Sequence, residues 1–440
     1  MSWDLVKLGE LITESRIPSE NPDPDRRITV RLNVLGVEKR PLENEKAGAT
    51  KQFIRKAGQF IYGKQNFHKG AFGIIPDELD GFESSADLPS FDVREDCLSE
   101  WIFYFFKQGG YYLELAKIAR GVATQRIHPE QIYDLEIPLP DIETQKNIIA
   151  SIKAIEEKGE KLKKELTYQL TLLENLNQAI LQEAVQGKLV PQDPNDEPAS
   201  ELLKRIKAEK ATLRQAQGKG KKEKPLPPIK PEEIPFEIPS TWVWCRLGEI
   251  TNYGSSPKAE PTDLKNDTWV LDLEDIEKTT SNLLCKIRFN ERNSLSTKSV
   301  FKTGDVLYSK LRPYLDKVIV ADEDGVCTTE ILPLKCFADL NPFYFKYALK
   351  RADFLKYVNS KTKGMKMPRL GTKEGEMALI PLPPLSEQKR IVAEIERQFA
   401  ITKQLKEHII QNQQATEQLL KALLHQAFMP TEAAVQAGED

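Results

Sequence analysis

The chain has 440 residues, of which 40% are hydrophobic and 29% are charged, and its formal net charge is −3 at pH 7. This length accommodates two or three globular domains, and no apolar stretch reaches the roughly 18 residues that cross a bilayer. The five cysteines form no Cys-x-x-Cys pair, the four histidines show no ligand spacing, and the first residues lack a secretion signal. We therefore expect a cytoplasmic protein without disulfides or a metal site.

The first predicted domain, residues 1–140, mixes helices and strands. Residues 59–62 are typical of a strand and 100–106 of a helix. Two polar segments combine basic side chains with amides, hydroxyls or an aromatic ring, which are the groups that meet phosphates and base edges of DNA, although either could be an ordinary solvated turn. The candidate DNA-binding residues of this domain are Lys64, Gln65, Asn66, His68, Lys69, Arg120, Thr124, Gln125 and Arg126. The basic residues Arg26, Arg27, Arg31, Lys51, Arg55 and Lys56 are weaker candidates because acidic residues lie near some of them in sequence.

Residues 141–187 are predicted to form a long central helix. Its apolar residues recur with an average spacing of 3.5 residues, which is the pattern of a coiled-coil seam. A helix of this kind would be about 60 Å long, and its one-sided apolar stripe requires a partner. Gly159 is a weak point of the stripe, and the amide of Gln169 is either buried or at a solvated edge. The predicted seam comprises Ile148, Ile152, Ile155, Leu162, Leu166, Leu173, Leu176 and Ile180.

Residues 188–236 read as a linker. They contain eight prolines and a basic tract at 219–224, a composition that favours extended chain. Within the linker, residues 200–216 are predicted to form a short charged helix.

The second predicted domain, residues 237–383, repeats the first. Five motifs recur in the same order, with an offset that settles at 243 residues. This period is too long for a solenoid and indicates duplicated domains. Residues 318–321 are typical of a strand and 342–358 of a helix. The motif pairs are Trp-x-x-x-x-Leu-Gly-Glu at Trp3 and Trp242, an apolar strand at 59–62 and 305–308, a glycine at Gly121 and Gly364, Ile-Pro-Leu-Pro at Ile137 and Ile380, and Gln-Lys at Gln145 and Gln388.

The second domain carries the strongest local positive charge. Residues 355–372 contain five basic residues and no acidic one. Because this segment and the one at 309–314 occupy the same places in the repeat as the polar segments of the first domain, we expect both to contact DNA, with solvated loops as the alternative. In an alternative assignment of roles, Arg369 binds a phosphate while Lys310, Arg312 and Tyr314 contact the bases. The candidates here are Ser309, Lys310, Arg312, Tyr314, Lys361, Lys363, Lys366 and Arg369.

Residues 384–428 repeat the long helix, and a mobile tail is expected at 429–440. Thr402 occupies the position of Gly159, and Asn412 that of Gln169. We expect an α+β fold with two mixed α/β domains in tandem, each followed by a long helix. If the helices form an antiparallel coiled coil with pseudo-two-fold symmetry, the domains lie at the two ends of a rod. The second seam comprises Ile391, Ile395, Leu405, Ile409, Leu419 and Leu423.

Segments that look catalytic are incomplete. Residues 341–344 resemble an Asn-Pro-Pro-Tyr methyltransferase signature, but no glycine-rich cofactor loop precedes them, so a helix start is expected. Asp141 with Glu156 and Lys158 fits a loose nuclease pattern, but the last two fall on the predicted long helix. We therefore predict no catalytic residue in this chain.

The paired motifs resemble those of a known family. Two variable domains that open on Trp-x-x-x-x-Leu-Gly-Glu, close on Ile-Pro-Leu-Pro before Gln-Lys and precede a long helix are similar to the specificity subunits of type I restriction-modification enzymes. Residues 381–391 match this pattern closely, whereas the first copy has Asp141 in place of the second proline.

The resemblance implies a non-catalytic DNA-recognition subunit. Each domain would be a target-recognition domain reading one half of a split double-stranded DNA site, and the helices would set the spacing. Two methyltransferase subunits and two restriction subunits would dock on the chain and use S-adenosylmethionine, ATP and Mg. The alternatives are a self-contained DNA methyltransferase or nuclease, and a coiled-coil adaptor that binds only protein.

Overall fold

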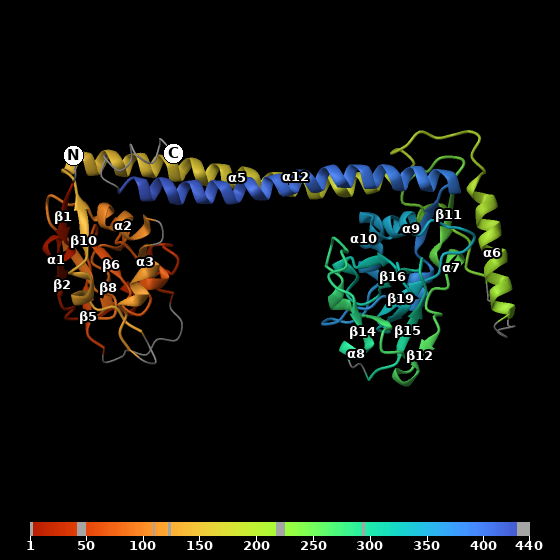
Figure 1. Ribbon diagram of the computed structural model, residues 1–440, viewed down its shortest axis with the longest axis horizontal. Coiled ribbons are helices and arrows are strands. Elements are labelled where there is room, and N and C mark those ends of the chain that lie inside the picture. Colours follow the sequence, from red (N-terminus) through yellow and green to blue (C-terminus); the bar gives the residue numbers. More distant parts are fainter. Residues whose placement is uncertain are drawn as a thin grey trace. The chain divides into compact units, whose positions relative to one another are not determined.

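The computed structural model describes residues 3–41, 50–108, 111–121, 125–216, 225–292 and 295–428. The chain divides into two compact units (Figure 1): the first comprises Met1–Tyr168 with His408–Asp440, and the second comprises Gln169–Glu407. Each unit contains one mixed domain together with part of each long helix. These helices are α5 (Ile142–Val185) and α12 (Leu385–Gln426).

The domain of the first unit is built on a four-stranded antiparallel sheet with strand order β2-β9-β6-β7. Helix α2 (Ser99–Lys107) packs on this sheet and forms an aromatic core with it. The sheet strands are β2 (Ile12–Ser15), β6 (Phe60–Tyr62), β7 (Phe72–Ile74) and β9 (Ser90–Val93), and the other elements are β1 (Asp4–Lys7), β3 (Ile28–Val30), β4 (Val37–Lys39), β5 (Gln52–Ile54), β8 (Glu83–Ser85), β10 (Glu136–Leu139), α1 (Leu8–Leu11), α3 (Tyr111–Glu114) and α4 (Pro129–Ile132).

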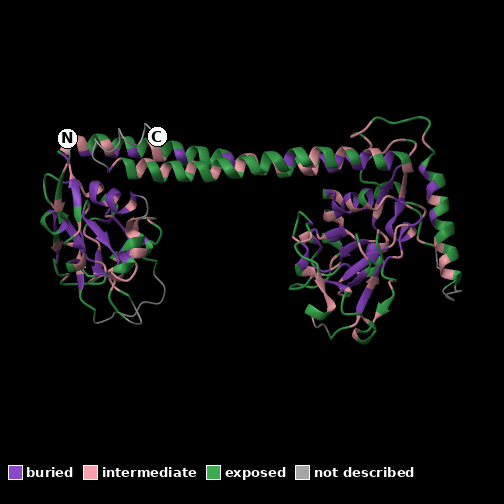
Figure 2. Ribbon diagram, in the orientation of Figure 1, coloured by how far each residue is buried: buried purple, intermediate pink, exposed green. Residues whose placement is uncertain are grey.

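The domain of the second unit contains a three-stranded sheet, β17-β16-β19, and a five-stranded sheet, β12-β15-β18-β13-β14. Buried residues concentrate on these sheets, whereas the middle parts of α5 and α12 are largely exposed (Figure 2). The strands are β11 (Val243–Arg246), β12 (Lys258–Ala259), β13 (Trp269–Leu271), β14 (Ile287–Arg288), β15 (Lys298–Phe301), β16 (Val306–Ser309), β17 (Val318–Val320), β18 (Gly325–Cys327), β19 (Ile331–Leu334) and β20 (Leu379–Leu382), and the helices are α6 (Ala199–Ala216), α7 (Leu247–Ile250), α8 (Phe289–Arg292), α9 (Pro342–Lys350), α10 (Ala352–Lys361) and α11 (Thr372–Glu376).

The single helix predicted over 342–358 is wrong, because the structure has two helices there. Arg351 lies between α9 and α10 in an extended conformation. Its buried guanidinium donates hydrogen bonds to the carbonyl groups of Ala348 and Leu379, at 2.8 and 2.6 Å. The buried charge therefore finds its acceptors where the helix is interrupted.

A strand pair joins the beginning and the end of each domain and accounts for two of the repeated motifs. β1 pairs antiparallel with β10, and β11 pairs in the same way with β20. The glycine of each Leu-Gly-Glu motif lies against the opposite segment: a Cβ on Gly9 would be 2.7 Å from Cβ of Tyr133, and a Cβ on Gly248 would be 2.9 Å from Cβ of Glu376. Both positions therefore require glycine for this close approach.

The repeated glutamine attaches each long helix to its domain. The buried Gln145 amide accepts a hydrogen bond from the Leu98 N–H and donates to the Pro140 carbonyl, at 2.9 and 2.8 Å. Gln388 makes the equivalent bonds with Asn341 and Pro383, at 2.9 and 3.0 Å. The Gln-Lys motif is therefore structural in both domains.

Helices α5 and α12 pair antiparallel in both units. In the first unit Gly159 faces Leu420, since a Cβ on this glycine would lie 2.7 Å from Cδ1 of Leu420. In the second unit the Thr402 hydroxyl donates a hydrogen bond to Oδ1 of Asn177 at 2.8 Å. Thr402 and Leu420 lie 243 residues after Gly159 and Asn177, respectively. The two contacts are therefore equivalent under the repeat.

The contact face of the helices differs in detail from the predicted seam. Asn412 is exposed, which agrees with the alternative of a solvated seam edge for this amide, and Asn177 is an amide that contacts the other helix. Ile152, Leu166, Ile180, Ile391 and Ile395 of the predicted seam are buried. Four seam leucines are between 45% and 59% exposed, namely Leu162, Leu176, Leu405 and Leu419.

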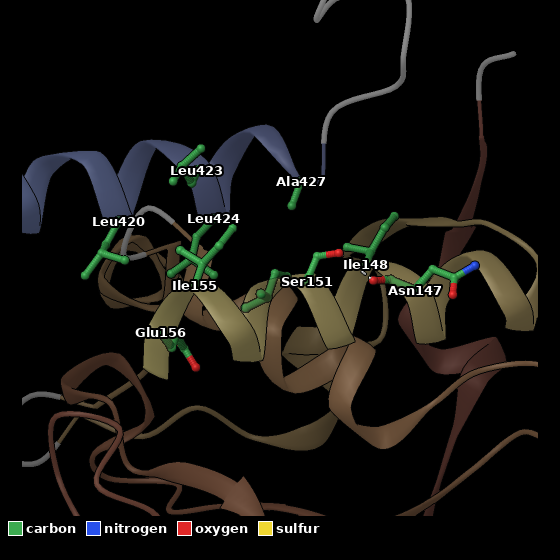
Figure 3. A pocket seen from close by; sticks show the side chains of 10 residues that line it. Asn147, Ile148, Ser151, Ile155, Glu156, Leu420, Leu423, Leu424 and Ala427 are labelled. Atoms are coloured by element: carbon green, nitrogen blue, oxygen red, sulfur yellow. Dashed lines mark hydrogen bonds between the residues drawn. The ribbon is translucent and has the colours of Figure 1, made fainter. Parts of the chain in front are cut away.

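In the first unit the paired helices also enclose a partly open cavity of about 260 Å³ (Figure 3). Ile148 and Ile155 of α5 line it together with Leu420, Leu423 and Leu424 of α12.

Candidate nucleic-acid interface

Each domain presents a hairpin at the place where an arginine-bearing loop was predicted. Arg120 and Arg126 exchange two backbone hydrogen bonds of 2.8 Å, and Lys363 and Arg369 exchange two of 3.0 and 3.1 Å. The residue after the first partner is a glycine with positive φ in both hairpins, 121° at Gly121 and 104° at Gly364. This conformation explains the repeated glycine, because other L-residues rarely adopt it.

The second predicted loop of each domain lies beside the hairpin. The Lys64 carbonyl accepts a hydrogen bond from the Ile127 N–H at 2.8 Å, and the Lys310 carbonyl accepts one from the Leu370 N–H at 2.9 Å. In the second domain the Arg312 N–H also donates to the Pro368 carbonyl at 2.7 Å. Two basic segments about 60 residues apart in sequence therefore form one surface in each domain.

An acidic residue that the sequence analysis did not single out connects the two loops. The backbone carbonyl of Asp87 accepts from the Lys64 N–H at 2.9 Å, and that of Glu330 accepts from the Lys310 N–H at 3.0 Å. Each acidic side chain faces the hairpin arginine: Asp87 lies 3.8 Å from Arg126, and Glu330 lies 3.0 Å from Arg369. Asp87 and Glu330 are 243 residues apart, so the repeat was the available signal.

The structure places most of the predicted DNA-binding side chains at the surface. Ser309 is an exception: it is 3% exposed and its hydroxyl donates to the Leu311 carbonyl at 2.8 Å, so its predicted role in binding DNA is wrong. Thr124 lies outside the described residues. The exposed candidates are Lys69, Arg120, Gln125, Arg312, Tyr314, Lys361, Lys363, Lys366 and Arg369, and the half-buried ones are Lys64, Gln65, Asn66, His68, Arg126 and Lys310.

The positive charge of the second hairpin is partly balanced by acids from outside the segment. Lys363 lies 3.3 Å from Glu374, and Arg369 is paired with Glu330. Between the lysines, the side chain of Met365 is fully exposed, a second feature that the sequence analysis missed. An exposed apolar side chain among basic residues suits contact with a thymine methyl group.

A buried ion pair supports the loop of the second domain. Arg312 and Asp316 both have left-handed φ values, 48° and 50°. The Lys350 ammonium donates hydrogen bonds to Oδ2 of Asp316 at 2.6 Å, to the Ser281 hydroxyl at 2.8 Å and to the Thr279 carbonyl at 2.8 Å. Burial raises the pKa of Asp316 to about 6, and the neighbouring Lys350 opposes this shift. Burial also lowers the pKa of Lys350.

Arg55 of the first domain is a structural residue, which corrects its interpretation as part of a basic surface. It is buried and donates hydrogen bonds to the hydroxyl groups of Ser84 and Ser90, at 2.7 and 3.0 Å. Burial lowers the pKa of this guanidinium to about 10.

The segments that resembled catalytic motifs have other roles. The side chain of Asn341 caps α9 by accepting from the N–H groups of Phe343 and Tyr344, at 2.9 and 3.2 Å. Glu156 lies on α5 and accepts hydrogen bonds from Tyr104 and Lys107. Within the described ranges, no three His, Cys, Asp or Glu residues are grouped as a metal site would require. Among the same residues, no helix is long and apolar enough to cross a membrane.

Comparison with known proteins supports the resemblance drawn from the motifs. Residues 239–412 match the family described as type I restriction modification DNA specificity domain. The chain is 38% identical over 274 residues to the EcoAI specificity subunit and 33% identical over 280 residues to the EcoEI specificity subunit, both type I restriction enzyme subunits of Escherichia coli. These alignments cover 59% and 58% of this chain but only 44% and 45% of the relatives, so the chain matches less than half of their length.

Three further comparisons extend over more of the chain. The EcoDI specificity subunit of Escherichia coli is 27% identical over 338 residues, which are 76% of this chain and 71% of that protein. The HsdS subunit from Thermoanaerobacter tengcongensis has the same fold, with a TM-score of 0.54 at 19% identity, covering 97% of this chain and 96% of that one. A chain from a type I R-M system structure gives a TM-score of 0.65 at 20% identity, covering 97% and 98%.

Proposed function

We propose that this chain, a relative of the type I restriction enzyme specificity subunits, recognises a split double-stranded DNA site, one half with each domain. The observation that carries the proposal is the repetition of one surface. In both domains a basic loop and an arginine-bearing hairpin are joined by equivalent backbone hydrogen bonds. A single duplicated surface of this kind suits two half-sites read in the same manner.

The side chains on this surface divide by chemistry. Exposed lysines such as Lys366 suit phosphates, which position the protein without reading sequence. Arginine and glutamine suit the major-groove edges of guanine and adenine. Arg369, Arg126 and Gln125 are therefore the base-reading candidates, with Arg312 and Tyr314 as further candidates in the second domain.

The rest of the proposal follows from the relatives. We propose that methyltransferase and restriction subunits dock on the chain, that these partners bind S-adenosylmethionine, ATP and Mg, and that the chain itself catalyses nothing. The paired helices would set the spacing between half-sites. Deleting two heptads from both α5 and α12 is expected to shorten that spacing while leaving both half-sites unchanged.

The test is to express the chain with its methyltransferase partner in cells and to sequence the methylated positions. Arg369→Ala is expected to change the bases accepted in one half-site, and Arg126→Ala those in the other. Arg288→Ala is the control, because Arg288 forms a surface pair with Glu323 in the same unit but outside the loops. Methylated sequences that are unaltered in both loop variants would contradict the assignment. Methylation or cleavage by the purified chain alone would favour a self-contained enzyme.

A further inference from the structure

We infer that Glu330 and Asp87 are positioning residues that orient Arg369 and Arg126 toward a guanine in each half-site. This inference rests on the proposed function, because it assumes that the two hairpins meet DNA. It adds a specificity role for two acids that face the arginines from turns elsewhere in the same domain.

The geometry is clearest in the second domain. Nε of Arg369 donates to both carboxylate oxygens of Glu330, at 3.2 and 3.0 Å. In the described part of the chain, neither Nη of Arg369 has a recorded hydrogen bond. The guanidinium is therefore held through Nε, which leaves the donors of its two Nη atoms available to a ligand.

The carboxylate is itself held in place. Glu330 directly precedes strand β19, whose residues are buried. Its carbonyl accepts the Lys310 N–H, and the hairpin bonds of Arg369 fix the backbone on the other side. Both ends of the ion pair are thus attached to ordered backbone, although the Arg369 side chain is 48% exposed.

This arrangement favours guanine over a phosphate. A guanidinium fork that presents two nitrogens matches O6 and N7 of guanine. A free arginine loses considerable side-chain entropy when it adopts one geometry, and an existing salt bridge reduces that loss on binding. An acid on a DNA-facing surface also repels phosphates, so Glu330 weakens nonspecific binding while it supports specific binding.

The first domain provides a looser version of the same pair. Nη2 of Arg126 lies 3.8 Å from Oδ2 of Asp87, and aspartate is one methylene shorter than glutamate. Nε of Arg126 is buried, and no hydrogen-bond partner is found for it among the described residues. We therefore expect Asp87 to orient its arginine less firmly than Glu330 does.

The experiment uses the full chain copurified with its methyltransferase partner. Duplexes bound by the wild-type complex are selected from a randomised pool, and each G·C pair of the selected site is then replaced. Glu330→Gln removes the negative charge of the side chain and keeps its shape. It is expected to lower discrimination at one G·C pair of one half-site about tenfold, a fraction of what a bidentate contact supplies. Affinity for nonspecific duplex should rise, and the other half-site should be unchanged.

Three further variants make the result decisive. Glu323→Gln removes the carboxylate of the ion pair with Arg288. This variant should change neither the discrimination at the G·C pair nor the affinity for nonspecific duplex. Arg369→Lys should lose at least as much discrimination at the same G·C pair, and the double variant with Glu330→Gln should lose no more than Arg369→Lys alone. Asp87→Asn should act on the other half-site with a smaller effect.

Other outcomes would overturn the inference. Equal losses of specific and nonspecific binding in Glu330→Gln would show a structural role. Additive losses in the double variant, or unchanged discrimination, would show that the acid does not act through Arg369. A wild-type complex without any sequence preference would overturn the proposed function itself.

Discussion

In the first domain the turn before strand β7 is made by Gly70, whereas in the second domain the equivalent turn, before β17, is made by Asp316. Gly70 has a φ of 80°, which glycine adopts freely. Asp316 has a φ of 50°, which is strained for a residue with a side chain, and its carboxylate is bound to the buried Lys350. The residue equivalent to Lys350 in the first domain is Lys107, which pairs instead with Glu156 on α5.

The comparison shows two solutions for supporting the same loop. A glycine makes the turn without an ion pair, and the loop of the first domain is held by the buried ring of Phe67, which stacks on Tyr62. An aspartate in this conformation depends on a lysine 34 residues away, which attaches the loop of the second domain to α9. The loop that carries Arg312 and Tyr314 is therefore sensitive to changes in a helix that is far from it in sequence.

The largest effect is expected from Lys350→Met. It leaves Asp316 as a buried charge without its partner, and such a change costs about 3–5 kcal/mol of unfolding free energy. Urea denaturation at pH 8, where Asp316 of the wild type is ionised, should show this loss in the second unit. Lys107→Met, at the partly exposed equivalent position, should cost less than about 1 kcal/mol.

A second variant separates the ion pair from simple misfolding. Lys350→Met combined with Asp316→Gly copies the arrangement of the first domain and should recover much of the lost stability. If the single variant is as stable as the wild type, the ion pair does not support the turn.

The next effect tests a feature that the domains share. Gln388→Leu leaves the Asn341 N–H and the Pro383 carbonyl without their partner, and it should cost about 1–3 kcal/mol. Gln145→Leu should cost a similar amount in the first unit. Calorimetry should show both losses. Gln398→Leu should change little, because among the described residues its amide bonds only to Glu394 on the same helix. Unequal losses for the two buried glutamines would show that the attachments are not equivalent.

A smaller effect is expected from Gly70→Ala. The alanine at this position must adopt a left-handed backbone conformation, which costs about 1–2 kcal/mol of unfolding free energy. Its Cβ would also lie 2.9 Å from the Val34 nitrogen. Gly58→Ala is the control, because Gly58 has a φ of 79° and a Cβ there meets nothing within 4 Å. Urea denaturation should rank Gly70→Ala below Gly58→Ala in stability, and the reverse order would exclude a role for the Val34 contact.

The last expected effect is a dependence of stability on pH. Because burial raises the pKa of Asp316 to about 6, its protonation favours the folded state. This contribution is fully present below the ordinary pKa near 3.8 and is lost as the pH rises through about 6. The unfolding free energy of the wild type relative to Asp316→Asn should therefore increase between pH 7 and pH 4.5. A constant difference in denaturation experiments across this range would contradict the raised pKa.

The sequence predicted the features that are visible as a repeated motif or as a regular spacing of apolar residues. Trp3 and Trp242, together with the 3.5-residue spacing, indicated two domains and two long helices, and the structure has them. The repeated Gln145 and Gln388 were visible as a motif, but their hydrogen bonds were not.

The features that sequence could not supply depend on contacts between distant segments. Glu330 reaches Arg369 across 39 residues, and Ser309 is buried because it lies in β16, the central strand of a three-stranded sheet. The break at Arg351 depends on a carbonyl of β20. The helix contact at Asn177 lies one position beyond the predicted seam residue Leu176, because a straight helix drifts relative to a perfect 3.5-residue repeat.

The equivalent contacts of Gly159 with Leu420 and of Thr402 with Asn177 limit how the chain can change its length. One residue inserted in α5 between Gly159 and Asn177 would rotate every following side chain by about 100°, so only one of the two contacts could persist. Seven residues inserted in one helix would again direct these side chains toward the other helix, but would shift the pairing of the two helices along their axis. Matched insertions of near-whole turns, such as one heptad in each helix, keep both contacts. Natural variants of this chain should therefore gain or lose helix length in both copies together.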